Sequence, residues 1–275
     1  MTEPQTALTT SVAEPQRKGE SRFKKTLGPI GAFLVLIGKF FAKLKYILLP
    51  ILKFGLPILK TGSSMILSIG IYAMAWGWQY ALGFVLLIFV HECGHLIAAR
   101  RIGLKVGAPV FIPFMGAFIA LKEAPPDAWI EAQVGIGGPI LGTLGALGCE
   151  GIYLATGNEL FVALANSGFF LNLFNLAPIG FLDGGRIVTA LSPWLWLVGL
   201  VAMVGLLFIH PSLILIIILL MSLPRVFSLF RRKTAAEQRY YEVTPQRRLI
   251  MGTMYFSLIG LLVWGMSVTL GQINR

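Results

Sequence analysis

The sequence has few charged residues for its length. Of its 275 residues, 13% are charged and 56% are hydrophobic, whereas ordinary soluble chains carry roughly 25% charged residues. Such a chain cannot cover its own surface with polar groups, so lipid is the natural solvent for much of it. Only two cysteines are present, Cys93 and Cys149, which are too few for the disulfide framework of a small secreted protein.

The sequence also lacks a recognisable signal peptide and a nucleic-acid-binding motif. Residues 1–27 lack the apolar core of a cleavable signal peptide and are predicted to form a disordered polar tail. The net charge of +11 is not accompanied by any nucleic-acid-binding motif. Its Lys and Arg residues cluster at the ends of apolar stretches, as membrane topology requires, so we expect no nucleic-acid partner.

Residues 28–61 mix apolar clusters with five lysines, at positions 39, 43, 45, 53 and 60. A spanning helix needs about 20 mostly uncharged residues, and these lysines interrupt every such run. The stretch is predicted to form one or two basic helices at the membrane interface. A poorly hydrophobic spanning helix over 27–38 is the alternative for part of it.

The rest of the chain contains a series of long apolar segments. We predict membrane-spanning helices at about 62–78, 81–99, 131–154, 160–179, 192–209, 211–224 and 249–270. Residues 106–121 are instead rich in β-branched and aromatic residues, with a proline and a glycine near the middle, and predict a β-hairpin. The fold class expected is an all-α polytopic membrane protein, a helical bundle with a small membrane-associated β-hairpin.

The positive charges also predict the orientation of the bundle. Basic residues before position 61, at 100–105, at 122 and 186, and at 225–248 should all face the cytoplasm, and alternating spans satisfy this arrangement. We therefore expect a multi-pass integral protein of a bacterial cell membrane with a cytoplasmic N-terminus, in contact with the lipid bilayer.

One apolar helix carries the pattern His91-Glu92-Cys93-Gly94-His95. Residues four apart lie on one face of a helix, so both imidazoles can bind one metal ion. Glu92 can then act as general base on the water molecule that the metal activates, as in the His-Glu-x-x-His motif. Ionisable groups inside an apolar span are costly and tend to be functional. Catalytic zinc needs three protein ligands, so one more must come from elsewhere.

The best candidate for the third ligand is Asp183, which follows Asn172, Asn175 and Pro178 in a helix-breaking segment. Irregular backbone at this point could direct the carboxylate inward. The alternative for Asp183 is an N-cap of the next helix, and for Asn172 helix packing is as plausible as a substrate contact.

The two motifs together resemble the site-2 protease family of intramembrane zinc metalloproteases, in a short form without a PDZ domain. The resemblance implies one Zn²⁺ bound by His91, His95 and Asp183, catalysis by Glu92, and substrate binding by Asn175. It also implies that the 106–121 hairpin pairs with an unwound substrate. Gly137-Gly138-Pro139 resembles the family's Gly-Pro motif. The family often has Asn three residues after the Pro, where this chain has Gly142, so close packing of small residues is the preferred interpretation of 135–145.

The function expected is cleavage of transmembrane segments of membrane proteins by metal-activated water. A catalytically silent scaffold and a metal transporter with the same bundle are the alternatives. The domains predicted are the tail at 1–27, the basic interfacial helices at 28–61, a metalloprotease membrane core at 62–190, and C-terminal transmembrane helices with a basic cytoplasmic loop at 191–275.

Overall fold

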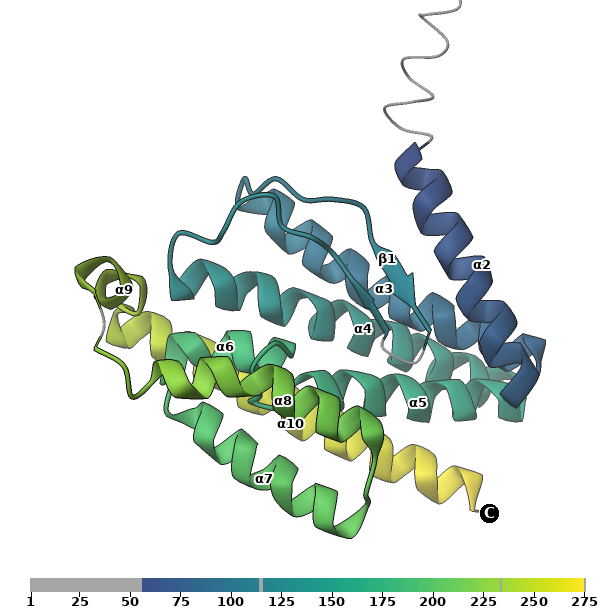
Figure 1. The fold of residues 1–275 in the computed structure, drawn as a ribbon. Helices are drawn as coiled ribbons and strands as arrows, with labels where there is room; N and C mark the ends of the chain where they lie inside the picture. Colours follow the sequence, from purple (N-terminus) through teal and green to yellow (C-terminus); the bar gives the residue numbers. More distant parts are fainter. Residues whose placement is uncertain (1–55, 114–115, 233, 275) are drawn as a thin grey trace, which may run out of the picture. The chain divides into compact units, whose positions relative to one another are not determined.

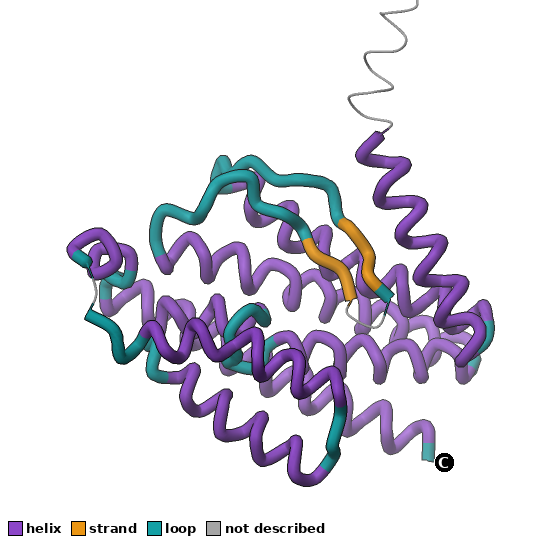
Figure 2. Tube along the Cα trace, viewed as in Figure 1, coloured by secondary structure: helices purple, strands orange, loops and turns teal. Residues whose placement is uncertain are grey.

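The computed structural model describes residues 56–113, 116–232 and 234–274. The predictions for residues 1–55, the polar tail and most of the basic interfacial helices, lie outside them. The described part of the chain consists of helices and one small hairpin (Figures 1 and 2). In chain order the elements are α2 (Leu56–Trp76), α3 (Trp78–Arg101), β1 (Val110–Ile112), β2 (Gly116–Phe118), α4 (Ala128–Thr156), α5 (Glu159–Asn175), α6 (Asp183–Leu191), α7 (Leu195–Ile209), α8 (Leu213–Ser228), α9 (Ala235–Tyr240) and α10 (Pro245–Ile273).

Three of these helices are long and apolar enough to cross a membrane: α3, α4 and α10. They coincide with the predicted spans at 81–99, 131–154 and 249–270. Helices α7 and α8 are apolar but shorter. Helix α5 has 17 residues and carries several polar side chains. Helix α2 contains Lys60 and a polar run at 61–64 that lower its hydropathy. The predicted fold class, a helical membrane protein with a small hairpin, is confirmed.

Helix α4 is the central element of the bundle, since it contacts α3, α5, α6 and α10. Its start is fixed by Asp127, whose side chain accepts a hydrogen bond of 2.7 Å from the Ile130 amide. Glycines bring α4 close to α3. A Cβ added to Gly94 would collide with the Gly137 carbonyl, and one added to Gly137 would collide with Ala98. The predicted small-residue packing of 135–145 is therefore confirmed.

The hairpin is shorter than the predicted range of 106–121 but is centred in it. Strands β1 and β2 pair antiparallel, and an isolated bridge joins Val106 to Leu121. Helix α2 covers β1: the Thr61 hydroxyl donates to the Pro109 carbonyl over 2.6 Å, and the Phe111 amide donates to the Ser64 hydroxyl over 3.2 Å. Thus β1 lies between α2 and β2, and β2 has the outer edge of the sheet (Figure 1).

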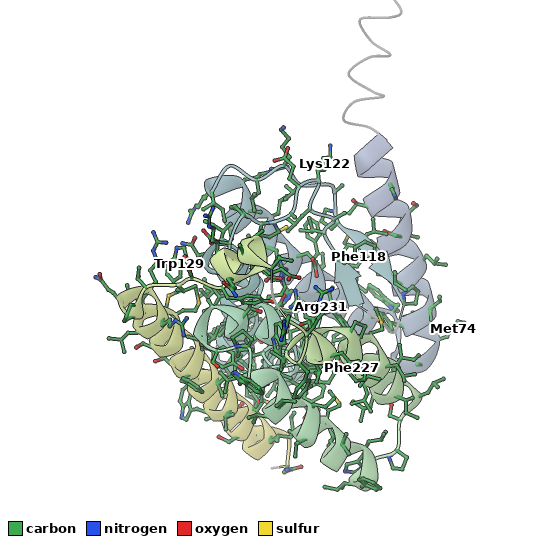
Figure 3. All side chains as sticks on the ribbon, turned by 60° about the vertical axis from the view of Figure 1, so that its left-hand side comes forward. Met74, Phe118, Lys122, Trp129, Phe227 and Arg231 are labelled. Atoms are coloured by element: carbon green, nitrogen blue, oxygen red, sulfur yellow. The ribbon has the colours of Figure 1, made fainter. Side chains whose placement is uncertain are left out.

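The outside of the bundle is rich in exposed apolar side chains, as Figure 3 shows for Met74 on α2, Phe118 on β2 and Phe227 on α8. A soluble protein rarely exposes so many large apolar side chains. This surface fits the three candidate spans and supports an integral membrane protein.

Candidate metal centre

The site is built on α3, where the apolar face of a membrane helix carries three buried ionisable side chains. His91, Glu92 and His95 are each less than 10% exposed. Since the two histidines are one helical turn apart, their rings lie close, with centroids 4.8 Å apart. The Nε2 atoms of the two rings are 3.1 Å from each other. The four-residue spacing therefore places both imidazoles on one face of the helix, as the sequence predicted.

Asp183 completes this arrangement from a different part of the chain. Its Oδ2 atom lies 3.1 Å from the Nε2 atom of His91 and 3.1 Å from that of His95. The carboxylate is buried. Asp183 is the first residue of α6, and the N-cap position belongs to Leu182. The N-cap alternative for Asp183 is therefore wrong.

The two glycines after Asp183 explain why α6 can begin at this point. A Cβ on Gly184 would collide with the carbonyl groups of Leu176 and Ala177, and one on Gly185 would collide with those of Ile179 and Gly180. The first turn of α6 thus packs directly on the backbone of the loop that follows α5. This close approach carries the Asp183 carboxylate to the histidines.

The outer nitrogens of both histidines are already occupied by acceptors. The Nδ1 atom of His95 lies 2.8 Å from the Val134 carbonyl oxygen of α4, and that of His91 lies 2.8 Å from the Oδ1 atom of Asn172 on α5. Because a carbonyl oxygen can only accept, each Nδ1 carries the hydrogen in the neutral ring and each Nε2 presents a lone pair. Metal-binding histidines are commonly held in this way.

These donors fit a zinc ion. Two imidazole lone pairs and a carboxylate oxygen that meet at 3.1 Å would repel one another unless a cation lies between them. Ligand atoms around a tetrahedral zinc with bonds of 2.0–2.1 Å are about 3.3 Å apart. The mixed nitrogen and oxygen set is also that of catalytic zinc sites. The structure thus supports the predicted zinc cofactor, with His91, His95 and Asp183 as the residues that would hold it.

Two carboxylates could serve as the third ligand, since a ligand atom of Glu92 also lies within 4.8 Å of those of the two histidines. Asp183 is the better candidate because its oxygen is 3.1 Å from both Nε2 atoms. Glu92 lies beside the centre and remains available for proton transfer.

A cavity of about 620 Å³ adjoins the centre. His91, Glu92, His95 and Asp183 form part of its wall, together with the edge strand β2 and an apolar face of α8 that includes Ile217 and Met221. Asn175 also lines the cavity, and its Nδ2 atom donates to the Leu171 carbonyl over 3.1 Å. The predicted substrate residue therefore lines the same cavity as the predicted metal ligands.

Two polar groups near the centre were not predicted from the sequence to lie at the site. Arg186 lies between two carboxylates, with Nη1 3.9 Å from the Oδ1 atom of Asp183 and Nε 4.0 Å from the Oε1 atom of Glu131. Glu131 is buried on α4 and binds Arg225 and Tyr240. The only signal in the sequence was an acidic residue near the start of an apolar segment, and such a residue is equally typical of an interface.

Residues 79–158 match the Peptidase family M50. A curated relative, the zinc metalloprotease MJ0392 of Methanocaldococcus jannaschii, is 27% identical over 137 residues. The match covers 46% of this chain and 39% of that protein, so the chain spans well under half the length of the relative it matches. The family match includes His91, Glu92 and His95 and ends before Asp183.

Proposed function

We propose that this chain is a member of Peptidase family M50 (the site-2 protease family) and a zinc metalloendopeptidase that cleaves transmembrane segments of membrane proteins. The observation that carries the proposal is the convergence of His91, His95 and Asp183 beside Glu92, inside an apolar bundle. The adjoining cavity is lined in part by β2, which pairs only with β1 in the described part of the chain. The zinc metalloprotease name of the relative supports the same activity.

The residues of the chain have separate tasks in this mechanism. When bound, zinc would polarise the scissile carbonyl and acidify the attacking water molecule. The Glu92 carboxylate would accept a proton from that water and deliver it to the amine of the leaving strand. The two Nδ1 hydrogen bonds hold the imidazoles so that their Nε2 lone pairs stay directed at one point.

The cavity suggests how a substrate would be held. A transmembrane helix hides its peptide bonds in its own hydrogen bonds, so it must unwind before hydrolysis. Because α2 lies against β1, the outer edge of β2 is the one available for a further strand. An extended substrate on this edge would regain the backbone hydrogen bonds that it loses on unwinding. Asn175 would bind the substrate backbone at the same cavity wall.

The domain boundaries and the orientation belong to the same proposal. Residues 62–190 would form the protease core, and residues 191–275 would add C-terminal membrane helices with a basic cytoplasmic loop around α9. The N-terminus would be cytoplasmic and the site near the cytoplasmic side. The boundary at 61–62 falls within α2. Labelling of single cysteines placed in this loop and near the Gly157 turn would test the orientation, since only one of the two should react from the cytoplasm.

The test of the proposed activity is the Glu92→Gln variant. Cells that contain either this variant or the wild type are compared for fragments of single-span membrane proteins, and the purified proteins are analysed for zinc. The variant should retain zinc and lose cleavage by roughly 10²- to 10⁴-fold, the usual contribution of a general base.

The matched control is Glu150→Gln, the same change on α4 at a carboxylate that binds Gln272. The control should cleave normally. Wild-type rates in the Glu92 variant would exclude the assigned base. Zinc binding without cleavage by the wild type would favour the scaffold or transporter alternative.

A further inference from the structure

A side-chain amide of α5 contacts the Nδ1 atom of His91, the ring nitrogen that does not face Asp183. Asn172 is almost fully buried, and its Oδ1 atom lies 2.8 Å from the Nδ1 atom of His91. Its Nδ2 atom donates to the Gly168 carbonyl over 2.7 Å. That second bond fixes the orientation of the amide, because a carbonyl can only accept. The oxygen of Asn172 therefore faces the histidine and requires a hydrogen on its Nδ1.

The space for this amide is provided by α4. A Cβ placed on Gly142 would collide with the Oδ1, Cγ and Nδ2 atoms of Asn172. Even the smallest side chain at position 142 would therefore force the amide away from its place behind His91. Gly148 on the same helix has open space around it and carries no such constraint.

We propose that Asn172 is a positioning residue that holds His91 as a metal ligand, and that Gly142 is required to leave room for it. This inference rests on the proposed metal centre. The Asn172 oxygen keeps the hydrogen of His91 on Nδ1 and prevents rotation of the ring, so the Nε2 lone pair stays directed towards His95 and Asp183. Packing alone would require neither the amide oxygen nor its orientation.

The two histidines are held by different kinds of acceptor. His95 relies on the Val134 backbone carbonyl, which no substitution removes, whereas His91 relies on a side chain. The support of His91 can therefore be removed by mutation without changing any predicted ligand.

The first experiment measures zinc affinity of the purified protein in Asn172→Leu and Asn172→Asp. Loss of such an outer partner typically weakens metal binding roughly 10- to 100-fold, and we expect this of the leucine variant. The aspartate variant retains an acceptor oxygen and should bind zinc within a few-fold of the wild type. Asn166→Leu is the matched control, because Asn166 is also on α5 but binds Thr269. It should leave zinc affinity unchanged.

The second experiment keeps asparagine at position 172 but displaces its side chain. Gly142→Ala should weaken zinc binding in the same way as Asn172→Leu, and Gly148→Ala should not. Cobalt(II) added to the zinc-free proteins reports the ligand geometry directly. The visible spectrum should change in Gly142→Ala and remain that of the wild type in Gly148→Ala.

The outcomes separate this inference from the proposed function. Wild-type protein that binds no zinc would refute both. Zinc binding and cleavage by the wild type, together with unchanged zinc affinity in Asn172→Leu and Gly142→Ala, would refute only the role of Asn172. Equal losses in Asn172→Leu, Asn172→Asp and Asn166→Leu would also refute it, because they would indicate packing of α5 and not the acceptor oxygen.

Discussion

Buried acidic and histidine side chains in the described part of the chain gather in two neighbouring regions. The two regions differ in whether the chain itself neutralises the buried charge. In the metal centre, two imidazoles and the Asp183 carboxylate all direct electron pairs at one point. In the region around Glu131, the acid is paired by the chain itself. Its Oε1 atom accepts from Arg225 over 2.6 Å, and its Oε2 atom accepts from Tyr240 over 2.6 Å.

This difference distinguishes a binding site, the metal centre, from a structural contact, the group around Glu131. A buried charge that is paired and hydrogen-bonded within the chain needs nothing further, and the Glu131 group holds α8 and α9 against α4. Arg225 also donates to the Gly180 carbonyl over 2.7 Å and lies over the Trp196 ring. In the metal centre Arg186 approaches only the Oδ1 atom of Asp183, so the Oδ2 atom and the two Nε2 lone pairs remain complementary to an external cation. We therefore expect substitutions in the first region to affect zinc and cleavage, and substitutions in the second to affect stability.

The largest effect is expected from removal of a predicted ligand. Asp183→Ala should lower zinc content to background and cleavage below detection, because two histidines do not complete a catalytic zinc site. Zinc analysis and a cleavage assay on the same preparation measure both. An Asp183→Ala protein with one bound zinc per chain would contradict the assignment and favour Glu92 as the third ligand.

Arg225→Met should destabilise the protein without loss of zinc. It leaves the Glu131 carboxylate buried with a weaker partner, and breaking such a pair costs about 3 kcal/mol or more. Arg225 is about one-third exposed, so the low end of that range is expected. Thermal unfolding in detergent measures the change. Loss of zinc together with stability would show that the two regions are one unit, linked through Arg186.

Removal of zinc should lower the stability of the wild type by about 2.7 kcal/mol when free zinc had been present at 100 times its dissociation constant. The same chelator should change nothing in Asp183→Ala. In Arg225→Met it should produce the wild-type shift on top of a lower starting stability, since the two contributions are expected to add. A chelator effect that persists in Asp183→Ala would point to a different metal site.

Tyr240→Phe should have the smallest effect, a loss of about 1 kcal/mol for one partly buried hydrogen bond. Burial and the Glu131 carboxylate raise the pKa of Tyr240 above its ordinary value, so the phenol remains a donor at neutral pH. Because the folded-state pKa is raised, this contribution is complete below about pH 10 and is lost as the pH rises through the folded-state value. Unfolding curves at pH 7 should therefore separate wild type and variant, and zinc content should be equal in both.

Much of the fold and half of the site follow from local sequence patterns. The histidine register depends only on helical periodicity, and the three long apolar spans depend on composition over about 20 residues. The hairpin was predicted from its β-branched and aromatic residues, and the structure places it within the expected range. Each of these features is set by neighbours in the chain, so the sequence by itself determined them.

The tertiary structure decided which residue of α5 meets His91. Asn172 and Asn175 are three residues apart on α5, and the sequence left the role of Asn172 open. In the structure Asn172 lies behind His91, while Asn175 lines the cavity. The choice depends on how α3, α4 and α5 cross, which is set by contacts such as Gly94 on Gly137 and Asn172 on Gly142. Those contacts join residues 30 or more positions apart, and no periodicity within one helix contains that information.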